Sequence, residues 1–217
     1  VWHADSPAAT LVKAESLMNR MMEIADTDET EYSWVYHNCG LFWSYTGHND
    51  KALPLYERSL RLAESSLGER DPNVMISLYT LAALYHKQGD YAKAEPLYGR
   101  ALRLREEVLG ERHPDVAESL NGLATLYSNQ GDYAKAEPLF KRALRLREEV
   151  LGERHPDVAS SLNSLANSYC NQGDYAKADP LYERALRLRE EVLGERHPDV
   201  ASSLNNLANS CSKQGEY

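Results

Sequence analysis

The sequence has no long hydrophobic run and little cysteine. No stretch of its 217 residues approaches the roughly 20 apolar residues that a membrane-spanning helix needs. No signal peptide is recognisable. The three cysteines, Cys39, Cys170 and Cys211, are odd in number and lack metal-ligand spacing. We therefore expect no membrane partner and a reduced, cytoplasmic protein.

Positive charge is also in short supply. The chain has 24 lysines and arginines against 33 acidic residues, a formal net charge of −9. The excess of acid is concentrated in residues 1–46, whereas residues 131–172 are balanced. Bulk attraction to nucleic acid or to an anionic membrane is excluded by this balance, so neither is an expected partner.

Catalytic motifs are absent as well. The sequence has no glycine-rich phosphate loop with a lysine, no HExxH, no CxxC and no GxSxG. His113, His155 and His197 recur at a fixed interval in the same polar segment, which places them too far apart to share a metal. We predict a structural role for these histidines, no cofactor, no metal and no enzymatic activity.

Two charged patterns have ordinary explanations. Arg103 lies four residues before Glu107, and Arg145 four residues before Glu149, which predicts solvated ion pairs along one helix. The Arg103-Leu104-Arg105 run and its copies resemble an anion-binding stripe. Because neighbouring glutamates neutralise the run, we predict a solvated face instead.

What the sequence does contain is a repeat. Shifting residues 131–172 by 42 positions in either direction nearly reproduces the same amino-acid sequence. Gly131 has counterparts at residues 47, 89, 173 and 215, and Pro156 at residues 72, 114 and 198. A fixed period of this size predicts a stacked-repeat architecture rather than a single globular core.

Each repeat predicts two helices. Leu162, Leu165, Ala166 and Tyr169 follow helical spacing, and Pro156 suits the first position of a helix, which we name helix A, ending near Gln172. A second helix, helix B, is expected from an N-cap at residue 174 to about residue 193, because apolar residues again follow helical spacing between two glycines. Helix B contains a proline at residue 180, near its start.

This unit resembles a tetratricopeptide repeat (TPR). The spacing of small and large residues in that family falls here on residues 162, 165, 166, 169, 173, 175, 178, 182 and 185. The family's closing proline is missing at its usual place, and helix B instead continues to Gly194, so the period is 42 rather than 34 residues. This longer form is similar to the repeats of kinesin light chains and to C-terminal arrays of bacterial NB-ARC (STAND-type) ATPases. The similarity lies in the sequence motifs AEPLY, RALRLRE and HPDVA.

The resemblance implies an all-α fold, a right-handed superhelical solenoid of about ten antiparallel helices. Residues 1–28 are expected to form a degenerate helix B of a preceding unit, and residues 29–217 the array, with units starting near residues 29, 71, 113 and 155 and a half unit at 197–217. We expect the natural protein to continue beyond Tyr217. In the divergent first helix A, Tyr36, Cys39, Gly40 and Trp43 occupy the packing positions, whereas Trp34 and Phe42 lie off that stripe. Cys211 takes the position of Tyr169 and is read as a smaller core residue.

Helix A lines the concave groove in repeats of this family, and partner peptides lie there. Adjacent units differ mainly in helix A while its packing residues stay fixed. The family's groove positions carried onto this chain give His37, Tyr79, Lys87, Asn121, Thr125, Asn129, Asn163, Asn167, Asn171, Asn205, Asn209 and Lys213. Because an amide both donates and accepts hydrogen bonds, the asparagines suit an extended peptide. The alternative is that Asn121, Asn163 and Asn205 only bond neighbouring helices.

We therefore predict a non-catalytic scaffold that binds a protein or an extended peptide in the groove. The resemblance favours the sensor segment of a STAND-type signalling protein, with a cargo adaptor similar to a kinesin light chain as the alternative. A third hypothesis is a self-assembly module that acts through its open ends, by end-to-end self-association.

Overall fold

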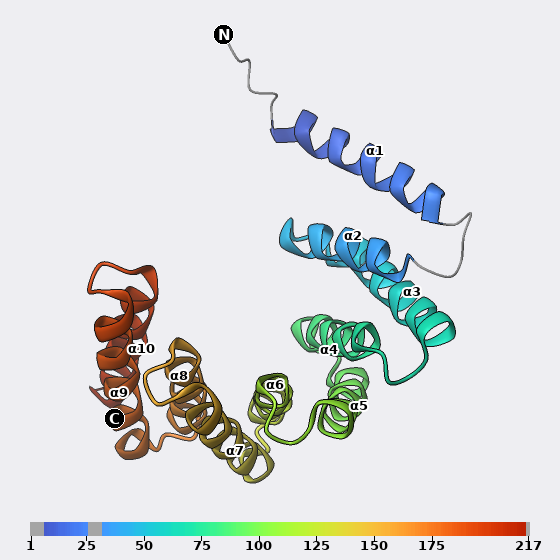
Figure 1. Cartoon of the computed structure of the whole chain (residues 1–217). Helices are drawn as coiled ribbons and strands as arrows, with labels where there is room; N and C mark the ends of the chain where they lie inside the picture. Colours follow the sequence, from blue (N-terminus) through green and yellow to red (C-terminus); the bar gives the residue numbers. More distant parts are fainter. Residues whose placement is uncertain (1–6, 26–31, 216–217) are drawn as a thin grey trace. The chain divides into compact units, whose positions relative to one another are not determined.

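A computed structural model describes residues 7–25 and 32–215, and these form ten α-helices without a strand. The helices are α1 (Pro7–Ala25), α2 (Ser33–Tyr45), α3 (Asn49–Leu67), α4 (Pro72–Lys87), α5 (Tyr91–Leu109), α6 (Pro114–Asn129), α7 (Tyr133–Leu151), α8 (Pro156–Asn171), α9 (Tyr175–Leu193) and α10 (Pro198–Gly215) (Figure 1). The even-numbered helices are helices A of the repeat and the odd-numbered ones helices B. The all-α fold is confirmed, and the predicted helix bounds agree with the structure to within one or two residues from residue 49 onward.

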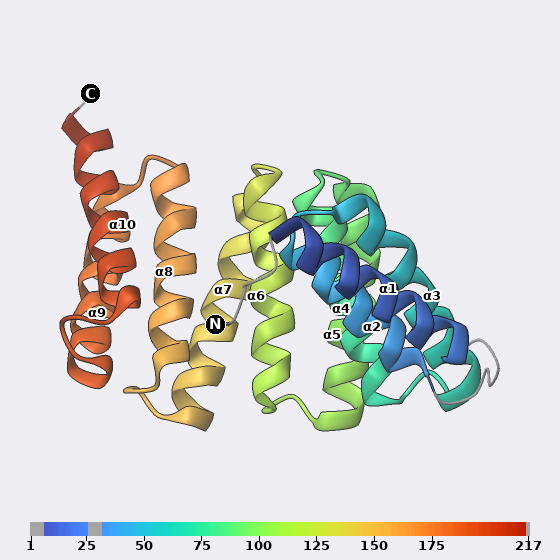
Figure 2. The ribbon, with the colours of Figure 1, turned by 90° about the horizontal axis from the view of Figure 1, so that it is seen from above.

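The chain divides into two compact units, Val1–Gln88 and Gly89–Tyr217. In the first unit, α1 packs on α2, α2 pairs with α3, and α3 packs on α4. In the second unit each helix from α5 to α10 packs on the next one along the chain. There α6, α8 and α10 also contact one another in order, and they stand side by side in Figure 2.

Local sequence explains where the helices begin. Three helices A start with a histidine N-cap followed by proline, and His155 shows the arrangement: its Nδ1 accepts a hydrogen bond from the Asp157 backbone N–H at 3.1 Å. His113 and His197 do the same for Asp115 and Asp199. The predicted structural role of these histidines is thereby confirmed, and its atomic form is a helix cap.

The helices B from α5 onward, which are α5, α7 and α9, begin after an aspartate N-cap and end at a glycine. The carboxylate of Asp174 accepts a hydrogen bond from the Lys177 backbone N–H, as predicted for an N-cap. Gly194 follows α9 with φ of 85°, a left-handed conformation that residues with a side chain rarely adopt. The helices α3, α5, α7 and α9 each contain one proline near the start of the helix, such as Pro180 in α9.

The core lies between helix A and helix B of each hairpin. In the last complete hairpin, Leu162 of α8 packs with Ala185 and Leu188 of α9. In α2 the predicted packing residues Tyr36, Cys39, Gly40 and Trp43 are all buried. Trp34 is exposed, and Phe42 stacks edge-on against Trp43 with 5.4 Å between ring centroids. Cys211 on α10 is exposed, so it is not the core residue expected from the sequence.

A recurring arginine near the end of helix B fastens each repeat to the next. Arg105 donates from Nη1 to the Asp115 carbonyl at 2.8 Å and to Ser119 Oγ at 2.8 Å. Arg147 and Arg189 make the equivalent bonds to the next helix A. The prediction of a solvated Arg-Leu-Arg face is therefore wrong for its second arginine: Arg105 is only 4% exposed, because the chain turns back over it after Gly110.

The ion pairs on the outer side also differ from the sequence prediction. Glu149 pairs with Arg112 at 2.8 Å rather than with Arg145 of its own helix. Glu106 pairs with Arg142 at 2.7 Å, and Glu148 with the next repeat's Arg184 at 2.8 Å. These pairs join successive repeats: Arg142 and Arg184 lie on the next helix B, and Arg112 lies in the loop between α5 and α6.

Candidate binding surface on the inner helices

All twelve predicted groove residues lie on helices A. They are distributed as His37 on α2, Tyr79 and Lys87 on α4, Asn121, Thr125 and Asn129 on α6, Asn163, Asn167 and Asn171 on α8, and Asn205, Asn209 and Lys213 on α10. Within each unit they fall into two sets. One set is buried or half-buried except for the exposed Asn205, and the other set is exposed except for the half-buried Thr125.

The first set occupies a single position of the repeat. Asn163 is only 6% exposed, and its Nδ2 donates a long hydrogen bond of 3.5 Å to Ser203 Oγ on α10. Its Oδ1 is buried without a hydrogen-bond partner, as are Asn121 Oδ1 and His37 Nδ1 at the same position of earlier repeats. Asn163 thus contributes to the contact between α8 and α10, and its role in a groove stays a prediction.

Burial also affects the protonation of two histidines on helices A of the first unit. It lowers the pKa of His37, and that of His86 on α4, because a buried imidazolium loses its hydration. The His37 ring lies 5.5 Å from the Tyr56 ring, with the planes tilted by 55°. Near neutral pH we therefore take both imidazoles to be uncharged.

The second set lines a hollow in the second unit. Between α8 and α10 a cavity of about 400 Å³ is lined by Asn167, Cys170, Asn171, Tyr182, Asn206, Asn209, Ser212 and Lys213. Four of these eight are predicted groove residues, namely Asn167, Asn171, Asn209 and Lys213, and all four are exposed. The structure therefore brings together amides and one cation from two successive repeats.

A tyrosine from helix B forms the floor of this hollow. The Tyr182 hydroxyl donates to Asn167 Oδ1 at 2.5 Å. Burial raises the pKa of Tyr182 well above its usual value, which keeps the hydroxyl protonated and able to donate. With Oδ1 held by this bond, the Asn167 amide nitrogen is directed elsewhere and remains available as a donor.

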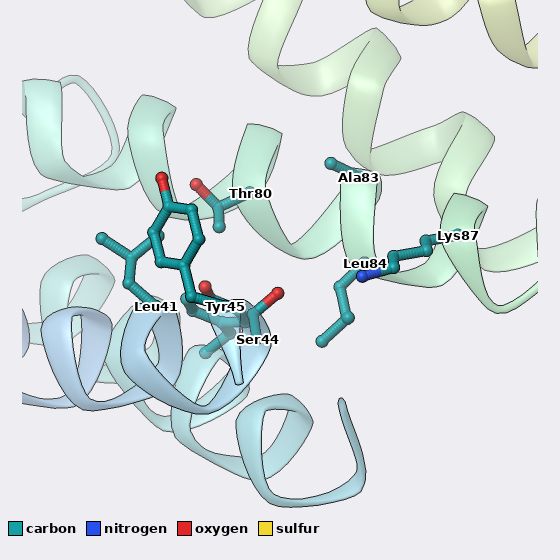
Figure 3. Close-up of a pocket in the computed structure, with 8 residues that line it drawn as sticks. Leu41, Ser44, Tyr45, Thr80, Ala83, Leu84 and Lys87 are labelled. Atoms are coloured by element: carbon teal, nitrogen blue, oxygen red, sulfur yellow. The ribbon is translucent and has the colours of Figure 1, made fainter. Parts of the chain in front are cut away.

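The first unit has a hollow at the same place in the repeat. Its cavity of about 250 Å³ is lined by Leu41, Ser44, Tyr45, Tyr56, Thr80, Ala83, Leu84 and Lys87. Figure 3 shows the α2 side chains facing those of α4 across it. All of these except Leu84 lie three repeats before a residue that lines the hollow of the second unit. The chemistry differs, because Leu41 and Ala83 stand where Asn167 and Asn209 stand later.

Sequence reasoning missed the helix-B residues Tyr56 and Tyr182 and the helix-A residues Thr80 and Asn206. Both tyrosines are core residues of their hairpins, and each also lines a hollow between helices A. A signal existed for Asn206, because the later repeats have an extra polar residue beside Asn205. Among the described residues, no group of three or more histidine, cysteine or acidic side chains is placed to hold a metal ion.

The fold and the two hollows indicate the class of protein. Stacked helix hairpins present a hollow between successive helices A in each unit, and this is the architecture of a helical-repeat scaffold. The sequence matches the tetratricopeptide-repeat family over residues 31–107, 73–149, 127–169 and 157–217. Since these matches cover most of the chain, the protein belongs to the tetratricopeptide-repeat family. None of the helices in the described residues combines the length and apolarity needed to cross a membrane.

Solved structures agree with this assignment. BtubC (BKLC) from P. vanneervenii has 28% sequence identity and a TM-score of 0.75, with 86% of this chain and 75% of that chain covered. Two structures of putative kinesin light chain repeats from P. anserina, nearly identical TPR-like repeats, have 23% identity. Their TM-scores are 0.71 and 0.70, with 83% of this chain and 85% and 86% of those chains covered, and they show the fold alone. No curated protein matches the sequence.

Proposed function

We propose that the protein is a non-catalytic scaffold that binds an extended polypeptide along helices A, with the hollow between α8 and α10 as the principal contact in the second unit. The observation that carries the proposal is the gathering of Asn167, Asn171, Asn209 and Lys213 around one open cavity. In the described residues Lys213 has no ion-pair partner, so its charge is available to a ligand.

The chemistry of these groups suits a peptide backbone. An extended chain presents one N–H and one C=O per residue, and each exposed asparagine can pair with either. Packed helices are about 8–10 Å apart, and an extended chain advances about 3.3 Å per residue. A bound segment would therefore place roughly every third residue at an equivalent position of the next repeat. Lys213 adds a preference for an acidic residue at one end of the segment.

The test is a selection of peptides from a random twelve-residue library on the immobilised 217-residue chain, followed by affinity measurements on the selected peptides. The binding variant combines Asn167→Ala, Asn209→Ala and Lys213→Ala. The matched control combines Glu183→Ala and Arg187→Ala, which removes an exposed ion pair of 3.6 Å on the outer helix α9. We expect at least a tenfold loss of affinity in the binding variant and no change in the control. Equal affinity of both for the selected peptides, or the absence of any selected peptide, would refute the proposal.

The biological context is a separate proposal. The similarity to putative kinesin light chain repeats supports an adaptor, in which the groove holds a cargo protein. The sensor segment of a STAND-type ATPase is the second context and rests on the resemblance of the repeat sequence alone. The two predict different neighbours in the natural polypeptide, a heptad coiled coil for the adaptor and a nucleotide-binding module for the sensor.

A further inference from the structure

Besides the hollow shown in Figure 3, the first unit has a second pocket between α2 and α4. This pocket has a volume of about 180 Å³, and Trp34 of α2 and Ile76 of α4 both line it, so we call it the Trp34 pocket. Leu41 lines the pocket and the hollow alike, so the two adjoin each other. Together they form a continuous depression, which we call the α2–α4 groove.

The α2–α4 groove exposes large apolar side chains. Trp34 is 50% exposed, Ile76 44% and Tyr45 87%. Trp34 and Ile76 occupy one position of the repeat, at which the later repeats have Glu118, Ser160 and Ser202. Helices A and B pair in those repeats with a polar residue at this position, so folding does not require an apolar one. Large apolar side chains that gather around a depression without a role in the core mark a binding surface.

The groove also has an available positive charge. Neither α2 nor α4 contains an acidic residue, although the chain as a whole has a net charge of −9. Lys87 lines the hollow and is exposed, and no carboxylate of the described residues pairs with it. Its ammonium group can therefore pair with a carboxylate of a ligand.

The two parts of the groove are spaced like two turns of a helix. The residues that line them are centred roughly six residues apart on α2 and roughly eight apart on α4, so at about 1.5 Å per residue the two parts lie about 9–12 Å from each other. Side chains seven residues apart on a helix share a face and are separated by about 10.5 Å. In an extended segment, side chains on one face are separated by about 7 or 13 Å. The spacing therefore favours a helical ligand.

Each part of the groove has room for one bulky side chain. An apolar cavity of about 150 Å³ holds one benzene molecule. The Trp34 pocket and the hollow measure about 180 and 250 Å³, so each accommodates the side chain of a phenylalanine or a leucine.

The groove offers few partners to a peptide backbone. Among the residues that line it, only Asn38 and Asn73 carry amides, and both line the Trp34 pocket. An extended segment would therefore leave most of its N–H and C=O groups unpaired over the groove. A helix pairs these groups internally, so it can lie on such a surface without that loss.

We propose that the α2–α4 groove binds an amphipathic helix of a partner protein. Two bulky apolar residues seven positions apart occupy the Trp34 pocket and the hollow, and an acidic residue of the helix pairs with Lys87. The inference goes beyond the proposed function, which has its principal contact with an extended segment in the second unit, and it does not depend on that contact.

The test begins with a library of helical peptides. Sixteen-residue alanine-based helices with one face randomised are displayed and selected on the immobilised 217-residue chain. We expect the selected peptides to have bulky apolar residues seven positions apart and an acidic residue about one turn beyond one of them. The absence of any selected peptide, or of this spacing among the selected peptides, would overturn the proposal.

Variants of the protein then locate the site by affinity measurements on the selected peptides. The groove variant combines Trp34→Ser, Tyr45→Asn and Ile76→Ser, which installs the residues that later repeats have at these exposed positions, namely Ser160, Asn171 and Ser202. We expect at least a tenfold loss of affinity. The variant of the second unit with Asn167→Ala, Asn209→Ala and Lys213→Ala should bind the helical peptides unchanged, so a failure here is distinguishable from a failure of the proposed function. Unchanged affinity in the groove variant would overturn the proposal.

Changes in the peptide keep the test decisive if the groove variant is destabilised, because they leave the protein unaltered. A proline at the centre of a selected peptide should weaken binding at least tenfold, since it breaks the helix. Moving one apolar residue by two positions, to the opposite face, should weaken it similarly. Equal affinity of the proline peptide would show that the occupant is extended and would overturn the helical assignment.

A double-mutant cycle tests the ion pair. Lys87→Gln in the protein and the change of the peptide's acidic residue to its amide should each weaken binding several-fold. Both changes together should weaken it no more than either one alone. Additive losses would contradict the contact with Lys87.

Discussion

The arginine that joins helix B to the next helix A offers the sharpest test of how the repeats hold together. Arg105 is almost fully buried, and its Nη1 reaches the Asp115 carbonyl, Ser119 Oγ and Glu118 Oε2 at 2.8, 2.8 and 2.9 Å. Arg147 has the equivalent bonds to a carbonyl and to Ser161, but it is only half-buried. The two sites therefore differ in burial and by one carboxylate.

Replacing each arginine by methionine keeps most of the apolar stem and removes the donors. A hydrogen bond from a charged group contributes about 1.5–3 kcal/mol, and a buried acceptor left alone costs about 1–3 kcal/mol. The Glu118 side chain is 47% exposed and turns to water, so its charge adds little to the loss. We expect Arg105→Met to lower the local free energy of unfolding by about 3 kcal/mol, and Arg147→Met by about 1–2 kcal/mol.

The assay is native-state hydrogen exchange at the first turns of α6 and α8. A repeat array need not unfold in one step, so a local measurement is more informative than a single melting temperature. Protection should fall most in α6 for Arg105→Met and in α8 for Arg147→Met. Equal losses at the two sites, or a larger loss for Arg147→Met, would refute the assignment of the difference to the deeper burial of Arg105.

Three further predictions follow from the same structure. Gly40→Ala would place a methyl group 2.7 Å from Tyr56 Cε1, so we expect a loss of about 1–3 kcal/mol in urea unfolding of the first unit. The free energy of unfolding should fall as pH drops below about 6.5, because burial lowers the pKa of His37 and His86 and the unfolded chain then binds more protons. The double substitution His37→Asn and His86→Ser, which installs residues of later repeats, should flatten that dependence in urea titrations at several pH values. Tyr182→Phe, the residue that the preceding repeat has there, should cost about 1 kcal/mol by thermal unfolding and weaken peptide binding through loss of its bond to Asn167.

Much of the fold follows from the sequence because the residues that begin and end its helices have direct physical consequences. A proline with a capping residue starts each helix A from α4 onward, and a glycine with positive φ separates the helices. Arg105 escaped prediction because helical periodicity describes one helix at a time, whereas its partners belong to the next helix A across a loop. For Asn163 the sequence left groove contact and bonding to a neighbouring helix open for a similar reason. Which amide reaches the open surface depends on how closely α8 and α10 approach, and no spacing within α8 determines that.

The two hollows differ in side chains at positions where the fold is the same. Leu41 and Asn167 occupy the same repeat position, and so do Tyr45 and Asn171, yet both units form the same helix pairing around them. Tyr45 is 87% exposed, so burial in the core does not account for an aromatic residue there. Because the fold accepts either an apolar or an amide side chain at these positions, their identity is free to follow the ligand. A single binding mode repeated along the array would need no such difference, so we expect the two units to contact chemically distinct parts of one partner.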